Sequence, residues 1–337
     1  MELTAVIQQV VSNHEVESSI SNSNHFIEAN TQQVTFAHLK QDCTIPVFAK
    51  DNETTIPHFE FIDAVRETAQ QLFPEEMVTM PNIRTSHVIK GRIPSAIGKP
   101  AKELFEHEKT IYYERIAFMV EIPHINAYID NQKLNLTIGG VRSYSEQNLF
   151  SKKSIEKFKI FIGFKNMVCC NLCIATDGLK DDLRVSSIEE LKSKSRDLFL
   201  SYNQEEHIDT MRQLQGYTIN QQQFAHLVGK MKLYQHLDKQ QKQQLFDLKI
   251  TDSQINTIIK NYVDDAHFGA DDYGYINLWN LYNLFTESSK SNYIDHFLSR
   301  NCNTYEFINH LGRSLQNQED NYFLQKYNPI VHMPEIL

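Results

Sequence analysis

Basic and aromatic side chains gather in one stretch of the chain, and together they suit contact with a single-stranded nucleic acid. Arg84, Lys90, Arg92, Lys99 and Lys102 fall within one short stretch that also holds glycine and proline. Glycine lets a backbone approach a phosphate closely, while arginine and lysine supply positive charge. Aromatic rings stack on bases. The predicted nucleic-acid-binding set is completed by five residues further along the chain: Tyr112, Tyr113, Arg115, Arg142 and Tyr144.

Three crowded cysteines form a second group that could do chemistry. Cys169, Cys170 and Cys173 contain one C-x-x-C pair, which is half of a common zinc site, but the sequence has no second pair. A redox thiol is expected at a helix start beside positive charge, whereas these residues lie in an apolar run. We therefore predict that they are buried and metal-free, with a redox or metal role as the alternative.

An acidic segment is the third group. Residues 264–272 hold four carboxylates and one histidine, namely Asp264, Asp265, His267, Asp271 and Asp272. Oxygen ligands of this kind suit a divalent metal, and a metal-dependent hydrolase is the least favoured of three hypotheses. The spacing does not match a calcium-binding loop, so a solvated connection between helices is expected. No phosphate-binding glycine loop or serine nucleophile motif is present, and the sequence predicts no cofactor and no catalytic centre.

The charge is divided unevenly along the chain. The net charge is −9 overall, −9 for residues 1–83, +6 for 84–170 and −6 for 171–337. A basic middle can mark a site for a phosphate-bearing partner, or it can simply neutralise the acidic segment before it. With no long apolar run, no secretory signal and an odd number of cysteines, we expect a cytoplasmic protein without a membrane span.

These side chains are expected to be positioned by an α+β fold. The sequence predicts an N-terminal helix and flexible linker over residues 1–30, a β-rich domain with an antiparallel sheet over 31–182, and an all-helical domain over 183–337. Strands are predicted at 111–122 and 134–141, joined around Asp130-Asn131, and at 158–164 and 168–175, joined at Lys165-Asn166.

Helices are expected where apolar residues recur with helical spacing. The first is 59–73, ended by Pro74, and a short helix is expected at 99–107. Two capping boxes mark later helix starts, Thr218 with Gln221 and Thr251 with Gln254. The helices predicted in the last domain are 187–214, 220–237, 251–265, 277–288, 291–299 and 303–317.

Several segments resemble a family of uncharacterised bacterial proteins, which is similar to a broader phage- and plasmid-borne group of unknown function. Among them are IRTSHVIKGRIPSA (83–96), YYERIAFMVEIP (112–123) and LWNLYNLFTESSKSNYIDHF (278–297). Two short motifs resemble the broader group: residues 168–171 (VCCN), with Cys170 where that group has threonine, and residues 283–287 (NLFTE), with Leu284 where it has alanine. The resemblance implies a mobile-element context and no catalytic assignment.

Two functional hypotheses are favoured over the metal-dependent hydrolase. The first is a non-catalytic nucleic-acid-binding accessory protein of a mobile genetic element, acting in replication, recombination or maintenance, with single-stranded DNA or RNA as its partner. The second is an interaction protein that blocks a host defence or restriction system, with a host protein as its partner. The location of charge separates them, because a DNA mimic spreads carboxylates over an exposed face and a DNA binder places lysine and arginine there.

Overall fold

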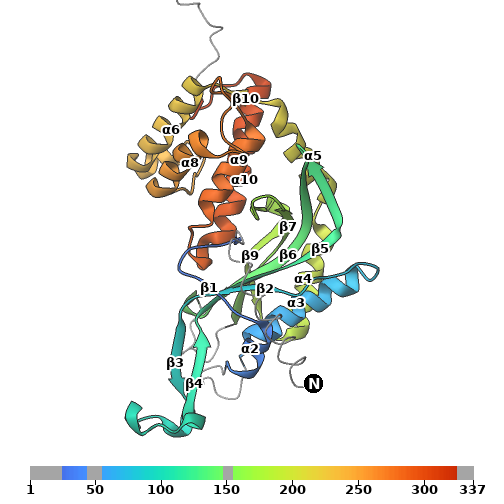
Figure 1. Ribbon diagram of the computed structural model, residues 1–337, viewed down its shortest axis with the longest axis vertical. Coiled ribbons are helices and arrows are strands. Elements are labelled where there is room, and N and C mark those ends of the chain that lie inside the picture. Colours follow the sequence, from blue (N-terminus) through green and yellow to red (C-terminus); the bar gives the residue numbers. More distant parts are fainter. Residues whose placement is uncertain (1–24, 44–54, 147–154, 325–337) are drawn as a thin grey trace, which may run out of the picture.

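The computed structural model describes residues 25–43, 55–146 and 155–324 (Figure 1). The helix and most of the linker predicted for residues 1–30 lie outside these ranges. Within them, the chain is an α+β protein with a curled antiparallel sheet in its first part and helices toward its C-terminal end. No helix in the described ranges is both long enough and apolar enough to cross a membrane.

A seven-stranded antiparallel sheet forms the centre of the molecule. Its path is β1-β2-β5-β6-β7-β8, and β9 also pairs with β7. Asp130 and Asn131 join β5 to β6 with φ values of 49° and 59°, the left-handed conformations that a two-residue hairpin turn requires. This turn confirms the sequence prediction. The strands are β1 (Gln32–Gln33), β2 (Asn82–Thr85), β5 (Arg115–Ile129), β6 (Gln132–Ser143), β7 (Glu156–Asn166), β8 (Leu172–Cys173) and β9 (Leu179–Val185).

Both faces of the sheet are covered. On one face lie α3 (His58–Leu72) and α4 (Ile188–Ser201), and α3 buries Phe61, Ile62, Val65 and Ala69 as its apolar spacing predicts. On the other face, Ala117, Met119, Val141 and Phe161 pack against Phe26, Ile27 and the first turns of α10 (Ile294–Asn317). Side chains alternate between the two faces along a strand, so the long central strands β5, β6 and β7 contribute to both cores. A short helix, α2 (Phe36–Gln41), packs beside α3.

The C-terminal helices form the far end of the molecule (Figure 1). The capping box of Thr251 with Gln254 is confirmed at the start of α8, whereas the box predicted for Thr218 is wrong, because Asn220 and Gln223 cap α6 instead. The predicted helix 187–214 is divided at Tyr202-Asn203, and the two predicted helices 291–299 and 303–317 are one. The elements are α5 (Gln204–Gln213), β10 (Thr218–Ile219), α6 (Gln221–His236), α7 (Lys239–Lys242), α8 (Asp252–Asp264), β11 (Ile276–Asn277), α9 (Leu278–Ser289) and α10.

Two boundaries differ from the sequence prediction. β7 continues through Asn166, so the predicted turn at Lys165-Asn166 is wrong, and the connection to the two-residue β8 occupies residues 167–171. β9 extends the sheet to Val185, so a boundary at residue 182 falls inside a strand. Buried residues of the sheet and of the C-terminal helices also form one continuous hydrophobic cluster.

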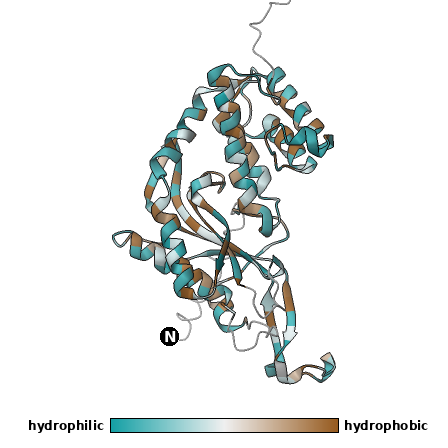
Figure 2. Cartoon of the chain, turned by 180° about the vertical axis from the view of Figure 1, so that it is seen from behind, coloured by the Kyte–Doolittle hydropathy of each residue, from teal (hydrophilic) through white to brown (hydrophobic). Residues whose placement is uncertain are grey.

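A β-hairpin arm projects from the sheet beyond the strands that flank it (Figure 1). It consists of β3 (Val88–Arg92) and β4 (Lys109–Tyr113), which pair with each other and continue from β2 and into β5, and Ile111 of β4 also forms an isolated bridge with Cys43. Its tip holds three turns of 3-10 helix at Pro94–Ala96, Ala101–Glu103 and Glu106–Glu108, in place of the predicted short helix. Hydrophobic and hydrophilic residues are mixed along the arm and its tip (Figure 2). Further 3-10 turns are Tyr144–Glu146, Thr176–Gly178 and Leu214–Gly216.

Candidate nucleic-acid interface

The arm gathers three cations on one of its faces. In the β3–β4 register Lys90 lies opposite Ile111, and Arg92 lies opposite Lys109. Because residues two apart in a strand point to the same side, Lys90, Arg92 and Lys109 share a face. Lys90 and Lys109 are exposed, Arg92 is partly exposed, and neither strand contains a carboxylate. Like charges held opposite each other repel, so this face is electrostatically suited to an anion.

The tip of the arm is organised around the carboxylate of Glu108. This buried side chain accepts the backbone N–H of Phe105 at 3.0 Å and pairs with the Lys99 ammonium. Both hydrogen bonds lower the pKa of Glu108, and the bond from Lys99 has the larger effect. Arg92 donates to the backbone carbonyl of Lys99. Lys99 is therefore committed to an internal carboxylate, whereas Lys102 is exposed and forms no ion pair with a described residue.

Arg84 lies inside the sheet rather than in a surface loop. It belongs to β2, between β1 and β5, and is only 6% exposed. Its Nε donates to the Thr31 hydroxyl and its Nη2 donates to the Thr31 carbonyl, both at 3.0 Å. The predicted phosphate contact of Arg84 is therefore corrected, because its guanidinium is bonded to the residue that precedes β1 and is turned away from solvent.

Arg142 is also internal, which corrects the second predicted phosphate contact. It is 1% exposed and forms an ion pair with Glu156, while its Nη1 donates to the Ile56 carbonyl. The guanidinium carbon lies 4.6 Å from the ring centre of Tyr144 and 4.4 Å from that of Phe158. A buried arginine held in this way has its charge compensated within the core and is not presented to a ligand.

The predicted stacking tyrosines pack against one another at the base of the arm. Tyr144 is buried, stacks on His58 at 4.6 Å and meets the edge of Tyr112 at 6.3 Å. The Tyr113 ring is 5% exposed, and its hydroxyl lies 3.0 Å from Nε2 of His38. Burial raises the pKa of Tyr144. The structure thus brings Arg142, Tyr112 and Tyr144 together, with Arg142 and Tyr144 buried and Tyr112 partly exposed, and it corrects the prediction that Tyr113 and Tyr144 offer free rings to bases.

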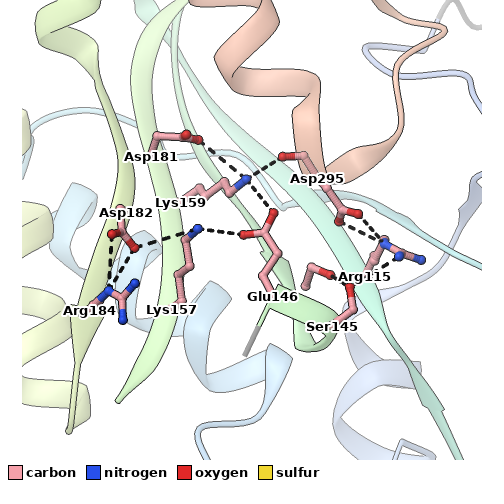
Figure 3. Close-up of polar contacts among 10 residues, drawn as sticks. Arg115, Ser145, Glu146, Lys157, Lys159, Asp181, Asp182, Arg184 and Asp295 are labelled. Carbon is pink, nitrogen blue, oxygen red and sulfur yellow. Dashed lines mark hydrogen bonds and ion pairs between the residues drawn. The ribbon is translucent and has the colours of Figure 1, made fainter. Parts of the chain in front are cut away.

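Arg115 belongs to an ion-pair network between the sheet and the start of α10 (Figure 3). Its Nε donates to Asp295 at 2.7 Å. The Lys159 ammonium lies 2.9 Å from Glu146 and 3.7 Å from Asp181, and it donates to the backbone carbonyl of Asp295. Arg115 is thereby neutralised by a partner 180 residues away, and the network fastens α10 onto the sheet.

The cysteines and the acidic loop have ordinary structural surroundings. Cys169 and Cys173 are buried as predicted, and burial raises the pKa of Cys169 to about 12. Cys170 differs, because it is partly exposed with a φ of 61° in the turn between β7 and β8. In the acidic loop, Asp265 accepts backbone N–H groups of His267 and Phe268. Over the described ranges, no three histidine, cysteine or acidic side chains are grouped to hold a metal ion.

The two short motifs that resemble the phage- and plasmid-borne group, residues 168–171 and 283–287, are in contact. The Asn171 side chain donates to the Asn283 carbonyl at 3.0 Å, and the Asn166 side chain donates to Oδ1 of Asn283 at 3.2 Å. Lys290, which is 1% exposed, donates to the Cys169 carbonyl at 2.5 Å and pairs with Glu287 at 2.8 Å. The motifs therefore form a buried polar junction between the turn after β7 and the end of α9.

Comparison with known proteins assigns the chain to a family. The family model described as "Domain of unknown function, B. Theta Gene description (DUF3871)" matches residues 5–324. The chain belongs to this family. No curated protein and no solved structure matches this chain.

The DUF3871 chain also has site residues that the sequence prediction missed. Lys109 lies outside the basic stretch 84–102, and only strand pairing brings it beside Arg92. Phe105 is 63% exposed at the tip of the arm. The sequence does hold a signal for Lys109. Lys90 and Arg92 are two residues apart, so on a strand their side chains point to the same side, and a residue paired with one of them on the neighbouring strand also points to that side.

Proposed function

We propose that this protein is a non-catalytic nucleic-acid-binding protein that uses the β3–β4 arm to contact phosphates of single-stranded DNA or RNA. The observation that carries the proposal is the strand register, which gathers Lys90, Arg92 and Lys109 on one face of a projecting hairpin. Lys102 adds an exposed cation at the tip. Four such contacts suit a weak, sequence-independent interaction dominated by phosphates.

The charges elsewhere in the described structure favour the arm over an acidic interaction surface. In the acidic first quarter, Asp42 contacts His38 at 2.7 Å, Glu67 pairs with Lys192 at 2.6 Å and Glu76 lies 3.2 Å from His124. Carboxylates that are engaged with a lysine or with histidine rings of the same chain make a poor imitation of a nucleic-acid backbone. The interaction protein that blocks a host defence therefore remains the second hypothesis and becomes an outcome of the binding test.

The biological setting is part of the same proposal. The motifs at 168–171 and 283–287 resemble those of a phage- and plasmid-borne group, and this supports an accessory role in the replication, recombination or maintenance of a mobile element. Single strands are exposed during each of these processes, so a weak, general affinity for them fits such a role.

The proposal is tested by fluorescence anisotropy with a labelled single-stranded oligonucleotide. The wild-type protein is expected to bind at low salt, with a slope of log affinity against log salt of about −2 to −3 for three to four neutralised phosphates. The triple variant Lys90→Ala/Arg92→Ala/Lys109→Ala is expected to lose most of that slope and at least tenfold in affinity.

The matched control removes three exposed lysines from the helical end of the molecule, as Lys239→Ala/Lys249→Ala/Lys260→Ala. It changes the net charge equally and is expected to bind within about twofold of wild type at low salt, because those residues lie far from the arm. Equal losses in both variants contradict a site on the arm. No binding to any oligonucleotide at tens of micromolar protein contradicts the proposed function and favours the interaction-protein hypothesis.

A further inference from the structure

At the tip of the arm, an aromatic ring is exposed to solvent from a turn that hydrogen bonds hold in place. Phe105 is 63% exposed, although its backbone N–H is held by the buried Glu108 carboxylate at 3.0 Å. The Glu108 N–H in turn donates to the Phe105 carbonyl at 3.0 Å, and the Ile93 N–H donates to the Glu108 carbonyl at 3.0 Å. Both ends of the turn are therefore fastened, and the ring is directed outward by this scaffold.

The surroundings of the ring combine a flat apolar surface with positive charge. The Lys99 ammonium lies 5.5 Å from the Phe105 ring centre, and the His107 ring lies parallel to it, with 5.6 Å between centres and 7° between planes. Lys102 is exposed in the preceding 3-10 turn. A nucleobase offers a flat π face attached to a phosphate, which matches an exposed ring with the exposed cation Lys102 in the preceding turn.

We infer that Phe105 is a stacking platform for an unpaired nucleobase, so that the arm prefers single strands over duplexes. This inference rests on the proposed function and deepens it, because the cations of the arm alone do not distinguish a single strand from a duplex. Tyr113 and Tyr144 of the predicted set are buried and cannot take this role, whereas Tyr112 is partly exposed with its ring against Tyr144 at the base of the arm.

The test places a fluorescent reporter at the tip. The sequence has one tryptophan, Trp279, and it is fully buried, so Phe105→Trp adds a solvent-exposed emitter that keeps an aromatic surface. An oligothymidylate of about 20 nucleotides is expected to quench this emission as it binds, with the same midpoint as the anisotropy titration. An oligomer of equal length made of abasic sugar phosphates is expected to bind more weakly and to leave the emission unchanged.

The companion variant Phe105→Ala is expected to lower affinity for oligothymidylate roughly 5- to 150-fold, the range for one stacked base, without changing the salt slope. Its thermal midpoint should match wild type, because the ring is mostly exposed. Tyr273→Ala is the control, since it removes a ring that is 86% exposed at the other end of the molecule, and it should bind as wild type does. Oligouridylate in parallel with oligothymidylate identifies whether RNA or DNA is preferred.

The outcomes separate the two claims. The stacking inference is overturned, while phosphate binding by the arm stands, if oligothymidylate and the abasic oligomer bind equally. The same conclusion follows if a duplex quenches the added emission of the Phe105→Trp variant as strongly as the single strand does. If no oligonucleotide changes the anisotropy at all, the proposed function fails and the stacking inference fails with it.

Discussion

Basic side chains are exposed on the arm but buried and internally bonded in the sheet. In the sheet and its junction with the helices, Arg84, Arg142 and Lys290 are buried and bonded to carbonyls, hydroxyls or carboxylates of the same chain. On the arm, Lys90 and Lys109 are exposed, and Lys109 has only the solvent-exposed Glu106 as a partner among the described residues. The difference shows that the role of a basic residue here depends on whether other elements cover it. A buried charge must be compensated within the chain, whereas an exposed charge can contact a ligand.

Breaking the buried ion pair of the sheet should have the largest effect. Arg142→Met leaves the Glu156 carboxylate, which is 8% exposed, without its cation, and we expect the free energy of unfolding to fall by about 3–5 kcal/mol. Urea unfolding measures this loss, and Arg142→Met/Glu156→Gln should recover part of it. If the Arg142→Met protein were as stable as wild type but bound oligonucleotides more weakly, Arg142 would be a ligand-binding residue and not a buried structural one.

The neighbouring histidine should make stability depend on pH. Burial, and then the charge of Arg142, lower the pKa of His58 to about 3, and burial lowers that of His207 to about 3. The unfolded chain therefore takes up protons that the folded chain excludes as pH falls from about 6.5 toward 3, and stability is lost over that window.

Each of these histidines should contribute a slope of about 1.4 kcal/mol per pH unit near pH 5. His58→Gln should remove one such contribution and His58→Gln/His207→Gln both, as measured by urea unfolding between pH 4 and 7. Identical slopes in all three proteins would contradict the placement of His58 as a neutral side chain beside Arg142.

Removing the cations of the arm should hardly affect stability. Lys90→Ala/Arg92→Ala/Lys109→Ala takes away partly or fully exposed side chains and the hydrogen bond from Arg92 to the tip, so the free energy of unfolding should change by less than about 1 kcal/mol. Thermal unfolding followed by circular dichroism checks this. A cooperative loss of the whole fold would show that the arm shares the core of the sheet.

The smallest effect is expected at the acidic neighbour of the arm. Glu106 hydrogen-bonds Lys109, and that bond lowers the pKa of Glu106. Glu106→Gln removes a negative charge that competes with phosphate, so oligonucleotide affinity at low salt should rise roughly two- to threefold, the effect of one exposed charge. Glu205→Gln on α5 is the control for net charge. An unchanged or lower affinity for Glu106→Gln would place the bound strand on another face.

Several elements follow from local sequence alone. The turn at Asp130-Asn131, the apolar face of 58–72 and the capping box at Thr251 were predictable because each depends on residues within one or two turns of chain. The α+β class follows from the order of strands and helices. The end of β7 was not predictable in this way: pairing with β6 and contact with Asn283 extend the strand through Asn166, where local sequence predicted a turn.

The fate of each charged residue was decided by tertiary structure. Composition and spacing determined that the middle of the chain is basic and aromatic, but Arg84 meets Thr31, Arg142 meets Glu156 and Ile56, and Arg115 meets Asp295, across separations of up to 180 residues. Burial depends on which strands and helices cover a side chain on both sides, and no local pattern contains that information. For the same reason only the β3–β4 register brought Lys109 beside Arg92, so that two like charges lie opposite each other.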